Sequence, residues 1–485
     1  MIKKFDILNH ADYCGEFRHD DYIPGLLKFN AAIESVRSKN KNTLLLDAGD
    51  EINRLLWYGK TVFDGMKLLK TDCMCLGNHE FDRGQKSLED NIEYIYKDIP
   101  ILCSNITYKE NGEFIKNVKP YIILERDNVK IGILGITTEY SEKMITYPNF
   151  EPFEMHSPID CARKYIPILR ECGADIVICL CHIGTAHDKE LNGELLEFYE
   201  GIEDLNVDLI IGGHTPGDIS EIRGNTVINK GGFSGKSLLH TTLYFDDEIR
   251  KVVEKETECI DVVNGKFELE NKEIEEFVNK TLEPFSDYFD DVFAYAKEEL
   301  LMSYSFESAL GDIFADAVRW KTGVDFTYFN TTSCGPRIPK GNITEYIIKQ
   351  ANYFNDPIYT SEMYGYEIKE LFETVHNPEI YNKNCNLMFS GLIVTINHNN
   401  PYKSKVVSIK SLDGKEIDLY SKYSVATSQY MASGGNDTRK LAQSREWTNT
   451  ELLIHDIYKD YFTYKKEVDN SIDNRYIFIG KPENQ

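Results

Sequence analysis

The first half of the chain alternates short apolar runs with stretches in which apolar residues recur at helical spacing. The runs have the length of strands, are rich in valine, isoleucine and leucine, and end near Gly, Asp, Asn or His; they include residues 43–46, 129–136, 174–180 and 208–211. Helical spacing lies between them, as over residues 22–38 and 161–172. Strands that alternate with helices predict an α/β domain with largely buried sheets.

The pattern changes around residues 271–299, which are acidic, aromatic and helical in period. We interpret this stretch as a connecting helix with a kink or break at Pro284. At 485 residues the chain exceeds what one hydrophobic core usually serves. The sequence therefore predicts a first domain over residues 1–265, a linker helix over 266–299 and a second domain over 300–480.

Composition narrows the range of partners. Hydrophobic residues make up 42% and charged residues 27% of the chain, which is typical of a folded globular protein. The formal net charge of -25 predicts repulsion of long nucleic acids and anionic membranes. A small phosphate-bearing substrate would be repelled too, unless a local positive source such as a metal cluster lies in its site.

Cysteine usage and the N-terminal residues bear on the cellular compartment. No long apolar stretch follows the first lysines, as a secretory signal requires, and no run approaches the ~20 apolar residues of a membrane helix. The 11 cysteines are odd in number and scattered, and several lie inside apolar runs. Reduced, buried thiols are expected from this pattern, and a cytoplasmic location with them.

Side chains of the metal-ligand type follow the apolar runs of the first half. Asp, Asn and His bind divalent metals of intermediate hardness, and at strand ends they would converge on one edge of a sheet. Any one of them alone is more often a satisfied core residue, but several in a fixed order indicate a metal site. The residues are Asp12, Cys14, Asp50, Asn78, His79, Asp82, His182 and His214.

The order D…GD…GNHE-x-D…H-x-G…GH-T resembles that of the calcineurin-like metallophosphoesterases. More narrowly, nearly the whole chain resembles the 5'-nucleotidase and UDP-sugar hydrolase family, most specifically in "LLLDAGD" and "LGNHEFDRG". The resemblance implies a four-layer α/β/β/α sandwich followed by a second α+β substrate-binding domain. It also implies an active site in the cleft between the domains, with the linker helix as the hinge.

The resemblance assigns roles in a two-metal centre held between two facing sheets. It makes Asp50 the ligand that bridges both metals. It places Asn78, His182 and His214 at one metal, and Asp12 at the other.

The same resemblance implies the chemistry. Two metals about 3.5–4 Å apart activate a water and clamp the attacking and leaving oxygens of an in-line displacement. His79 would face the phosphoryl group, and Asp82 would orient its ring. The implied reaction is hydrolysis of a phosphate ester, with a nucleoside 5'-monophosphate as the expected substrate.

The second domain carries candidate substrate contacts that rest on the resemblance. "NTTSCGPR" makes Arg337 the candidate phosphate contact, with Asn330 a further match. Phe354 and Tyr430 match the two aromatic residues that grip a flat base, and Asn436 the polar contact to its edge.

This chain departs from the family pattern at one metal site. Cys14 stands where the family has a histidine, and Pro216 stands where a second histidine or glutamine is usual. Three explanations stay open. Cys14 binds as a thiolate, which favours zinc; His10 or Asp218 substitutes; or one metal binds and catalysis is weakened or lost. One or two divalent ions per chain are therefore expected, with Zn, Mn or Co favoured.

Two other functions remain as alternatives. One is a phosphodiesterase or UDP-sugar pyrophosphatase. The other is a catalytically weakened or inactive nucleotide-binding homologue. In the second domain, Phe306 occupies the position where relatives place an arginine, which leaves fewer positive charges for a phosphate.

Overall fold

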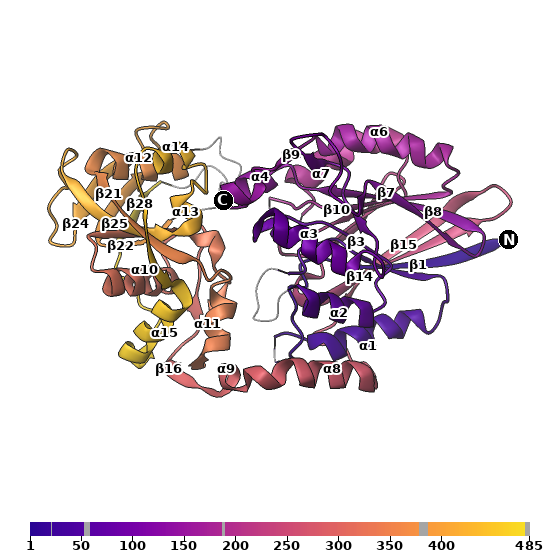
Figure 1. Ribbon diagram of the computed structural model, residues 1–485, viewed down its shortest axis with the longest axis horizontal. Coiled ribbons are helices and arrows are strands. Elements are labelled where there is room, and N and C mark those ends of the chain that lie inside the picture. The colour runs from indigo at the N-terminus through magenta and orange to yellow at the C-terminus, as the bar shows by residue number, and fades with distance from the viewer. Residues whose placement is uncertain (21, 53–58, 187–189, 378–386, 481–485) are drawn as a thin grey trace. The chain divides into compact units, whose positions relative to one another are not determined.

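The computed structural model describes residues 1–485 apart from residues 21, 53–58, 187–189, 378–386 and 481–485. The chain divides into two compact units, Met1–Pro284 and Phe285–Gln485. Figure 1 shows the elements of each unit along the chain.

The first unit contains two mixed sheets. The seven-stranded sheet has the order β15-β14-β1-β2-β3-β4-β6 and the six-stranded sheet the order β12-β13-β11-β10-β8-β7. Strands β1, β2, β3, β4 and β6 run parallel in the first sheet, as do β8, β10, β11 and β13 in the second. The strands of the first sheet are β1 (Ile2–His10), β2 (Thr43–Asp47), β3 (Cys73–Cys75), β4 (Ile101–Leu102), β6 (Val118–Lys119), β14 (Ser237–Asp246) and β15 (Lys251–Asp261). Those of the second are β7 (Tyr121–Arg126), β8 (Val129–Thr137), β10 (Ile176–His182), β11 (Leu209–Gly212), β12 (Ile219–Arg223) and β13 (Thr226–Lys230).

Two apolar layers hold this unit together. One joins side chains of both sheets, including Ile7, Leu46, Ile133 and Ile178, so the sheets face each other. The other joins the second face of the six-stranded sheet to α6 and α7, as through Ile166. Helix α1 packs against β1 on the far side of the seven-stranded sheet (Figure 1). The predicted four-layer α/β/β/α sandwich is confirmed.

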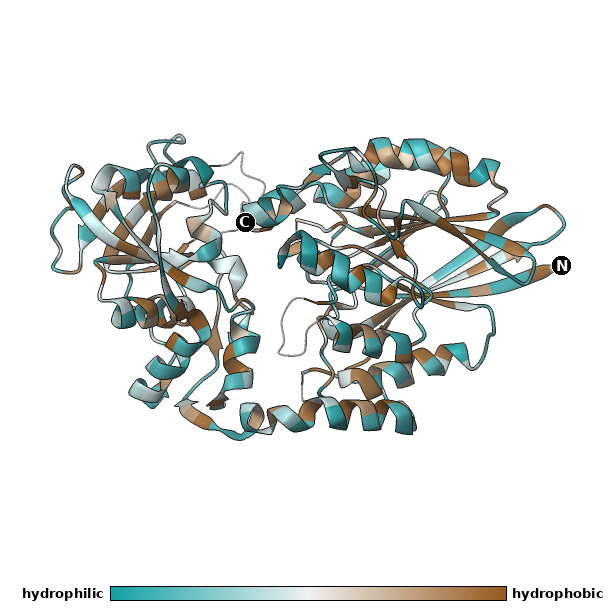
Figure 2. Cartoon of the chain, in the orientation of Figure 1, coloured by the Kyte–Doolittle hydropathy of each residue, from teal (hydrophilic) through white to brown (hydrophobic). Residues whose placement is uncertain are grey.

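Two helices of the first unit lie close to predicted helical stretches, namely α1 (Gly25–Arg37) within residues 22–38 and α6 (Pro158–Glu171) over most of residues 161–172. Helix α6 starts at Pro158 because the Ser157 side chain accepts a hydrogen bond from the Asp160 N–H. The longer helices bury apolar side chains on one face, such as Phe29, Phe63, Leu88 and Leu195. Figure 2 colours the hydrophobic and hydrophilic residues along them. The helices are α1 (Gly25–Arg37), α2 (Lys60–Leu68), α3 (Gly84–Ile95), α4 (Ser141–Met144), α5 (Tyr147–Phe150), α6 (Pro158–Glu171), α7 (Gly193–Ile202) and α8 (Lys272–Leu282); β5 (Ile106–Tyr108) and β9 (Phe153–Met155) form a small antiparallel pair.

The stretch expected as one connecting helix is shorter and interrupted. Helix α8 packs on α1 and α2, and a 3-10 turn over Glu283–Phe285 follows it at Pro284. Helix α9 (Ser286–Asp290) then ends, and β16 (Val292–Ala296) pairs with β20 (Gly341–Thr344). The helix predicted to reach residue 299 is therefore wrong beyond residue 290, because alternating aromatic and small residues in "VFAYA" suit a strand.

The second unit is built on a five-stranded sheet of order β22-β18-β25-β21-β26. Helices α10 and α15 cover one face, where Phe314 and Tyr458 stack at 4.1 Å between ring centroids. Helix α12 covers the other face, with the sheet β24-β23-β28 beyond it. This is the predicted α+β arrangement. Its strands are β17 (Leu300–Leu301), β18 (Phe326–Asn330), β19 (Arg337–Ile338), β21 (Pro357–Tyr364), β22 (Leu387–Ser390), β23 (Leu392–Asn397), β24 (Val406–Ser411), β25 (Lys422–Ser428), β26 (Thr448–Leu453), β27 (Glu467–Val468) and β28 (Tyr476–Ile479), and its further helices are α10 (Ala309–Thr322), α11 (Glu345–Ala351), α12 (Gly365–Val375), α13 (Gln429–Ala432), α14 (Arg439–Gln443) and α15 (Ile454–Lys465).

Two general features concern the described residues. None of their helices combines the length and the apolar character that crossing a bilayer requires. Ten cysteines fall within the described ranges, and all are free thiols.

A partly buried histidine, His240, joins β1 to β14 and β15. His240 Nε2 lies 2.9 Å from Asp6 Oδ1, and Nδ1 lies 2.9 Å from Glu258 Oε1. Burial opposes charge on both His240 and Asp6, but their mutual contact raises the pKa of His240 and lowers the pKa of Asp6. The stabilisation from His240 is complete below its unfolded pKa of 6.5 and is lost as pH rises through the folded value, whereas that from Asp6 is lost in acid.

We therefore expect the His240→Gln substitution to lower the melting temperature more at about pH 6 than at about pH 9. Thermal unfolding followed by circular dichroism across this range measures the difference between the two proteins. An equal loss at every pH would contradict a charged His240 in the folded state.

Candidate metal centre

Several candidate ligands follow strand ends in a strained backbone. Asp12, after β1, has φ 53°, Asp50, after β2, has φ 62°, and His214, after β11, has φ 70°. Non-glycine residues in this left-handed region each cost on the order of 1 kcal/mol, and such strain gathers at functional sites. Here the turns direct the side chains of three neighbouring loops toward one another.

Asp50, His182 and His214 form the centre of the site. One ligand atom from each lies within 4.8 Å of the others. His182 Nδ1 lies 2.7 Å from the Ala48 carbonyl oxygen, so Nδ1 donates to it and Nε2 faces Asp50. The Nε2 atom is 2.9 Å from Asp50 Oδ2 but is not aligned for a hydrogen bond.

The unsatisfied atoms of the centre match a cation. Asn78 Oδ1, His182 Nε2 and His214 Nδ1 are buried and have no hydrogen-bond partner among the described residues. Buried polar atoms are nearly always bonded, so each orphaned atom needs an explanation. Two imidazole nitrogens, an amide oxygen and the Asp50 carboxylate are a donor set for one divalent ion of intermediate hardness. Asn78, His182 and His214, which the sequence analysis assigned to one metal, therefore suit a divalent ion at this position.

Electrostatics agree with a positive charge at this position. Burial opposes ionisation of both groups, yet the charge of His182 lowers the pKa of Asp50 and the charge of Asp50 raises the pKa of His182 to about 10. Burial, with the nearby His182, lowers the pKa of His214 to about 3. His214 is therefore neutral, as a metal ligand must be.

Glu80 organises the loops that carry the ligands, and the sequence analysis missed this role. Its Oε2 accepts hydrogen bonds from the N–H groups of Asp50 at 3.1 Å and Gly77 at 2.6 Å, and its Oε1 from that of Glu51 at 2.9 Å. Glu80 is buried, and burial raises its pKa to about 7. The only signal in the sequence was an acidic residue directly after Asn78-His79.

His79 and Asp82 form a pair at the exposed side of the centre. His79 Nδ1 lies 2.7 Å from Asp82 Oδ2, and His79 Nε2 lies 3.8 Å from Asp50 Oδ2. The His79 N–H also donates to Asp50 Oδ1 at 2.8 Å. Asp82 thus fixes the ring so that Nε2 points toward the centre.

Asp12 lies beside the centre and ties its loops together. Its Oδ2 accepts a hydrogen bond from the His214 N–H at 2.9 Å, and its own N–H donates to the Gly49 carbonyl at 2.8 Å. The Cys14 thiol lies 3.1 Å from the Asp12 carbonyl oxygen and 3.5 Å from that of Asp50, so it is placed to donate to main-chain oxygens.

The other candidate replacements have different surroundings. Asp218 Oδ1 accepts hydrogen bonds from Ser237 Oγ at 2.7 Å and from the Gly232 N–H at 3.2 Å. His10 is grouped with Asp47 and Glu51 rather than with Asp50. Replacement of the missing ligands by Cys14, His10 or Asp218 stays a prediction.

The loop that contains Pro216 is held by a buried ammonium group. The nitrogen Nζ of Lys230 donates to the carbonyl oxygens of Thr215, Pro216 and Gly217 at 2.7, 2.7 and 2.8 Å. The Lys230 side chain has no exposed surface. This loop follows His214 directly, so Lys230 fixes the position of a candidate ligand.

In the second unit, the structure brings some candidate substrate contacts together. The Tyr430 hydroxyl donates to Asn436 Oδ1 at 3.3 Å, and the Tyr430 N–H donates to Asp356 Oδ2 at 3.3 Å, close in sequence to Phe354. A side chain at Gly435 would meet the Tyr430 ring at 2.3 Å, so glycine is needed there.

The two remaining candidates have protein partners. Arg337 pairs with Glu299, with 2.7 Å between Nη1 and Oε1, and Asn330 is buried and donates from Nδ2 to Thr332 Oγ1 at 2.9 Å. Arg337 keeps about a third of its side chain exposed, at 36%.

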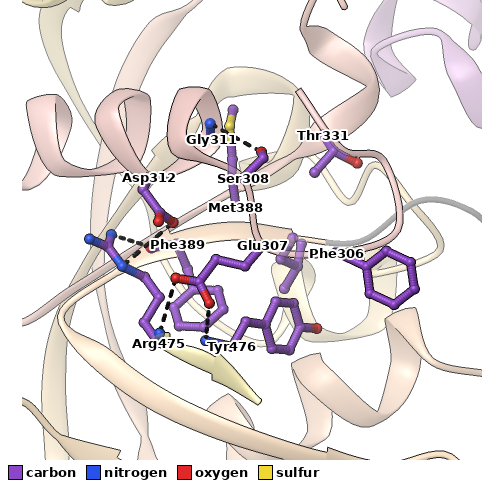
Figure 3. Close-up of a pocket in the computed structure, with 11 residues that line it drawn as sticks. Phe306, Glu307, Ser308, Gly311, Asp312, Thr331, Met388, Phe389, Arg475 and Tyr476 are labelled. Atoms are coloured by element: carbon purple, nitrogen blue, oxygen red, sulfur yellow. Dashed lines mark hydrogen bonds and ion pairs between the residues drawn. The ribbon is translucent and has the colours of Figure 1, made fainter. Parts of the chain in front are cut away.

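Figure 3 shows a pocket lined in part by Phe306. Phe306 occupies the position at which the family resemblance places an arginine. Glu307 accepts hydrogen bonds from the main-chain N–H groups of Arg475 and Tyr476 at 3.1 and 3.0 Å. The Arg475 guanidinium lies 3.5 Å from Asp312 Oδ1. The charges of this pocket are therefore engaged in joining β28 to α10.

The chain was compared with known proteins. A family model described as calcineurin-like phosphoesterase matches residues 19–218, and one described as 5'-nucleotidase, C-terminal domain, matches residues 293–443. A snake venom 5'-nucleotidase of Naja atra is 31% identical over 210 residues, which cover 41% of this chain and only 37% of that protein. A 5'-nucleotidase of Vibrio cholerae is 24% identical over 517 residues, covering 96% of this chain and 91% of that protein.

A solved structure shows the same fold. The crystal structure of a 5'-nucleotidase precursor from Thermus thermophilus matches with a TM-score of 0.84 and 20% identity, over 99% of this chain and 100% of that one. The two family models cover the units in the order that the sequence motifs predicted. The chain therefore belongs to the 5'-nucleotidase family of metallophosphoesterase hydrolases, with a calcineurin-like phosphoesterase domain followed by a 5'-nucleotidase C-terminal domain.

Proposed function

We propose that this chain hydrolyses the phosphate ester of a nucleoside 5'-monophosphate with the help of divalent metal. The observation that carries the proposal is the convergence of Asp50, His182 and His214 around orphaned ligand atoms, beside the His79–Asp82 pair. A divalent ion, when bound there, polarises a phosphoryl oxygen and lowers the pKa of water toward about 7. The acidic surface, of net charge -25, makes such a local positive source necessary for an anionic substrate.

The side chains around the centre have separable roles. His79 donates from Nδ1 to Asp82, which orients Nε2 toward the phosphoryl group; with both ring nitrogens protonated, Nε2–H donates to a phosphoryl oxygen or gives its proton to the leaving oxygen. Arg337 is the proposed phosphate contact of the second domain, and its guanidinium suits two oxygens at once. Phe354 and Tyr430 are proposed to hold the base, with Asn436 at its edge. The cytoplasmic location is likewise a proposal.

A substrate panel tests the proposal. The purified chain is assayed with nucleoside 5'-monophosphates, bis(p-nitrophenyl) phosphate and UDP-glucose under added Mn, Zn, Co, Mg and Ca. Turnover of the monophosphates that depends on metal is expected. Turnover of the diester or of UDP-glucose alone would replace the proposal by the phosphodiesterase or pyrophosphatase alternative. Nucleotide binding without turnover under any metal would indicate an inactive homologue.

The Asp82→Asn substitution is expected to lower kcat by about tenfold to a hundredfold with little change in KM, because the neutral amide orients His79 less well. Steady-state kinetics with the best monophosphate measure both constants. Asp64→Asn is the matched control, since Asp64 on α2 is bonded to Tyr94 and Lys67 rather than to a candidate ligand. A change in KM alone would contradict the role of Asp82.

The Phe354→Ala substitution is expected to lower kcat/KM for a nucleoside monophosphate by about tenfold, since stacking on a base contributes on the order of 1–3 kcal/mol. Ribose 5-phosphate, which has no base, should be hydrolysed as by the wild-type chain. Tyr366→Ala, at an exposed aromatic residue of the same domain, is the control. Equal losses on both substrates would show that Phe354 supports the fold rather than the base.

A further inference from the structure

A second group of ligand-type side chains lies at the ends of β1 and β2. His10, the last residue of β1, pairs in parallel register with Asp47, the last residue of β2. Together with Glu51 they form a group in which one ligand atom from each residue lies within 4.8 Å of the others. His10 Nδ1 is 3.6 Å from Glu51 Oε1. All three side chains are completely buried.

The group has more polar atoms than partners. Both ring nitrogens of His10, Asp47 Oδ2 and Glu51 Oε2 are buried without a hydrogen-bond partner among the described residues. Aromatic rings surround His10, with centroids 6.0 Å away at Tyr13 and 5.2 Å at Phe29. In the described part of the chain, no lysine or arginine forms an ion pair with Asp47 or Glu51. Two buried carboxyl groups beside an unbonded histidine are unfavourable unless a proton or a metal ion joins them, and a divalent ion also uses the free nitrogen of His10.

The other oxygens of the two carboxylates are already held in place. Asp47 Oδ1 accepts a hydrogen bond from the Gly49 N–H at 2.8 Å. Glu51 Oε1 accepts one from the Tyr13 N–H at 3.4 Å. Main-chain donors of this kind orient metal-binding carboxylates and leave their second oxygens directed at an ion.

We propose that His10, Asp47 and Glu51 bind a divalent transition-metal ion, zinc or manganese, in addition to any ion at Asp50, His182 and His214. One neutral imidazole and two carboxylates are a common donor set for these metals, and with a divalent ion the group has no net charge. A water or the second oxygen of Glu51 completes the coordination. The ion joins the ends of β1 and β2, from which Asp12 and Asp50 extend. This second metal site does not depend on the proposed hydrolysis.

Metal content of defined variants tests the proposal. The full chain is stripped with a chelator, reloaded with excess zinc, freed of unbound metal and measured by elemental analysis. His10→Asn and Glu51→Gln are each expected to retain about one equivalent less than the wild-type chain, since each removes a ligand. His214→Asn, the matched control, removes a ligand from the Asp50 centre, and combining it with His10→Asn should lower the content further. Wild-type content in both His10→Asn and Glu51→Gln would overturn the proposal.

A second measurement avoids variants that fail to fold. Wild-type crystals grown with zinc are measured on both sides of the zinc absorption edge. An anomalous peak among His10, Asp47 and Glu51 supports the proposal, and a peak at the Asp50 centre without one here overturns it. Neither measurement requires turnover. A chain that hydrolyses no phosphate ester but shows this peak would lose the proposed function and keep the second metal site.

Discussion

The Asp50→Asn substitution is expected to lower kcat/KM for nucleoside monophosphates by at least about a thousandfold. Asp50 is 1% exposed, its Oδ2 faces His182 Nε2 at 2.9 Å, and its Oδ1 accepts the His79 N–H at 2.8 Å. Asparagine keeps the shape of the side chain but removes the charge that attracts a divalent ion. Loss of the metal clamp costs several kcal/mol of transition-state stabilisation, and each ~1.4 kcal/mol corresponds to tenfold in rate.

Steady-state kinetics and elemental analysis of the same preparations measure this effect. Asp90→Asn is the matched control, because Asp90 on α3 is 66% exposed and pairs with Lys86 at the surface. We expect the control to keep wild-type activity and metal content. Full activity of Asp50→Asn would mean that hydrolysis does not depend on the metal centre of Asp50, His182 and His214.

The alternation of strands and helices predicted the first domain well because its parallel strands are buried on both faces. Residues 174–180 and 208–211 overlap most of β10 (Ile176–His182) and β11 (Leu209–Gly212), and these strands end at or shortly before a candidate ligand. Buried strands give continuous apolar runs, and side chains after their carboxyl ends meet at one edge. That logic placed His182 and His214 together without any structural information.

The features that the sequence analysis did not reveal depend mainly on contacts that no local pattern encodes. Nothing local shows that Glu80 would accept main-chain N–H groups from two loops, or that the Cys14 thiol would face the Asp12 and Asp50 carbonyl oxygens. Residues 292–296 follow a stretch that is helical in period, and the pairing of their alternating side chains with β20 as a strand was not foreseen. The role of Lys230 on β13 was not predicted either, because its three acceptors follow His214 and lie 13 to 15 residues before the lysine.

The Lys230→Met substitution is expected to lower the free energy of unfolding by about 3 kcal/mol, because three carbonyl oxygens lose a charged donor and hydrogen bonds of this kind contribute on the order of 1–3 kcal/mol each. Methionine fills a similar volume, so lost packing contributes little. The freed loop of Thr215, Pro216 and Gly217 follows His214, and we expect the metal affinity of the Asp50 centre to fall with it.

The Lys255→Met variant is the control that distinguishes a loss of stability from a displacement of His214. Lys255 Nζ also donates to buried acceptors, at 3.2 Å to the Asp208 carbonyl and 3.1 Å to Asp208 Oδ1, and its side chain is 12% exposed. Both variants should melt at lower temperature than the wild-type chain, but Lys230→Met alone should bind zinc more weakly in a competition titration with a chromogenic chelator. Equal zinc affinities in the two variants would mean that Lys230 supports only the fold. A weaker affinity in Lys230→Met would make this ammonium group, rather than a second histidine, the element that holds the loop after His214 in place.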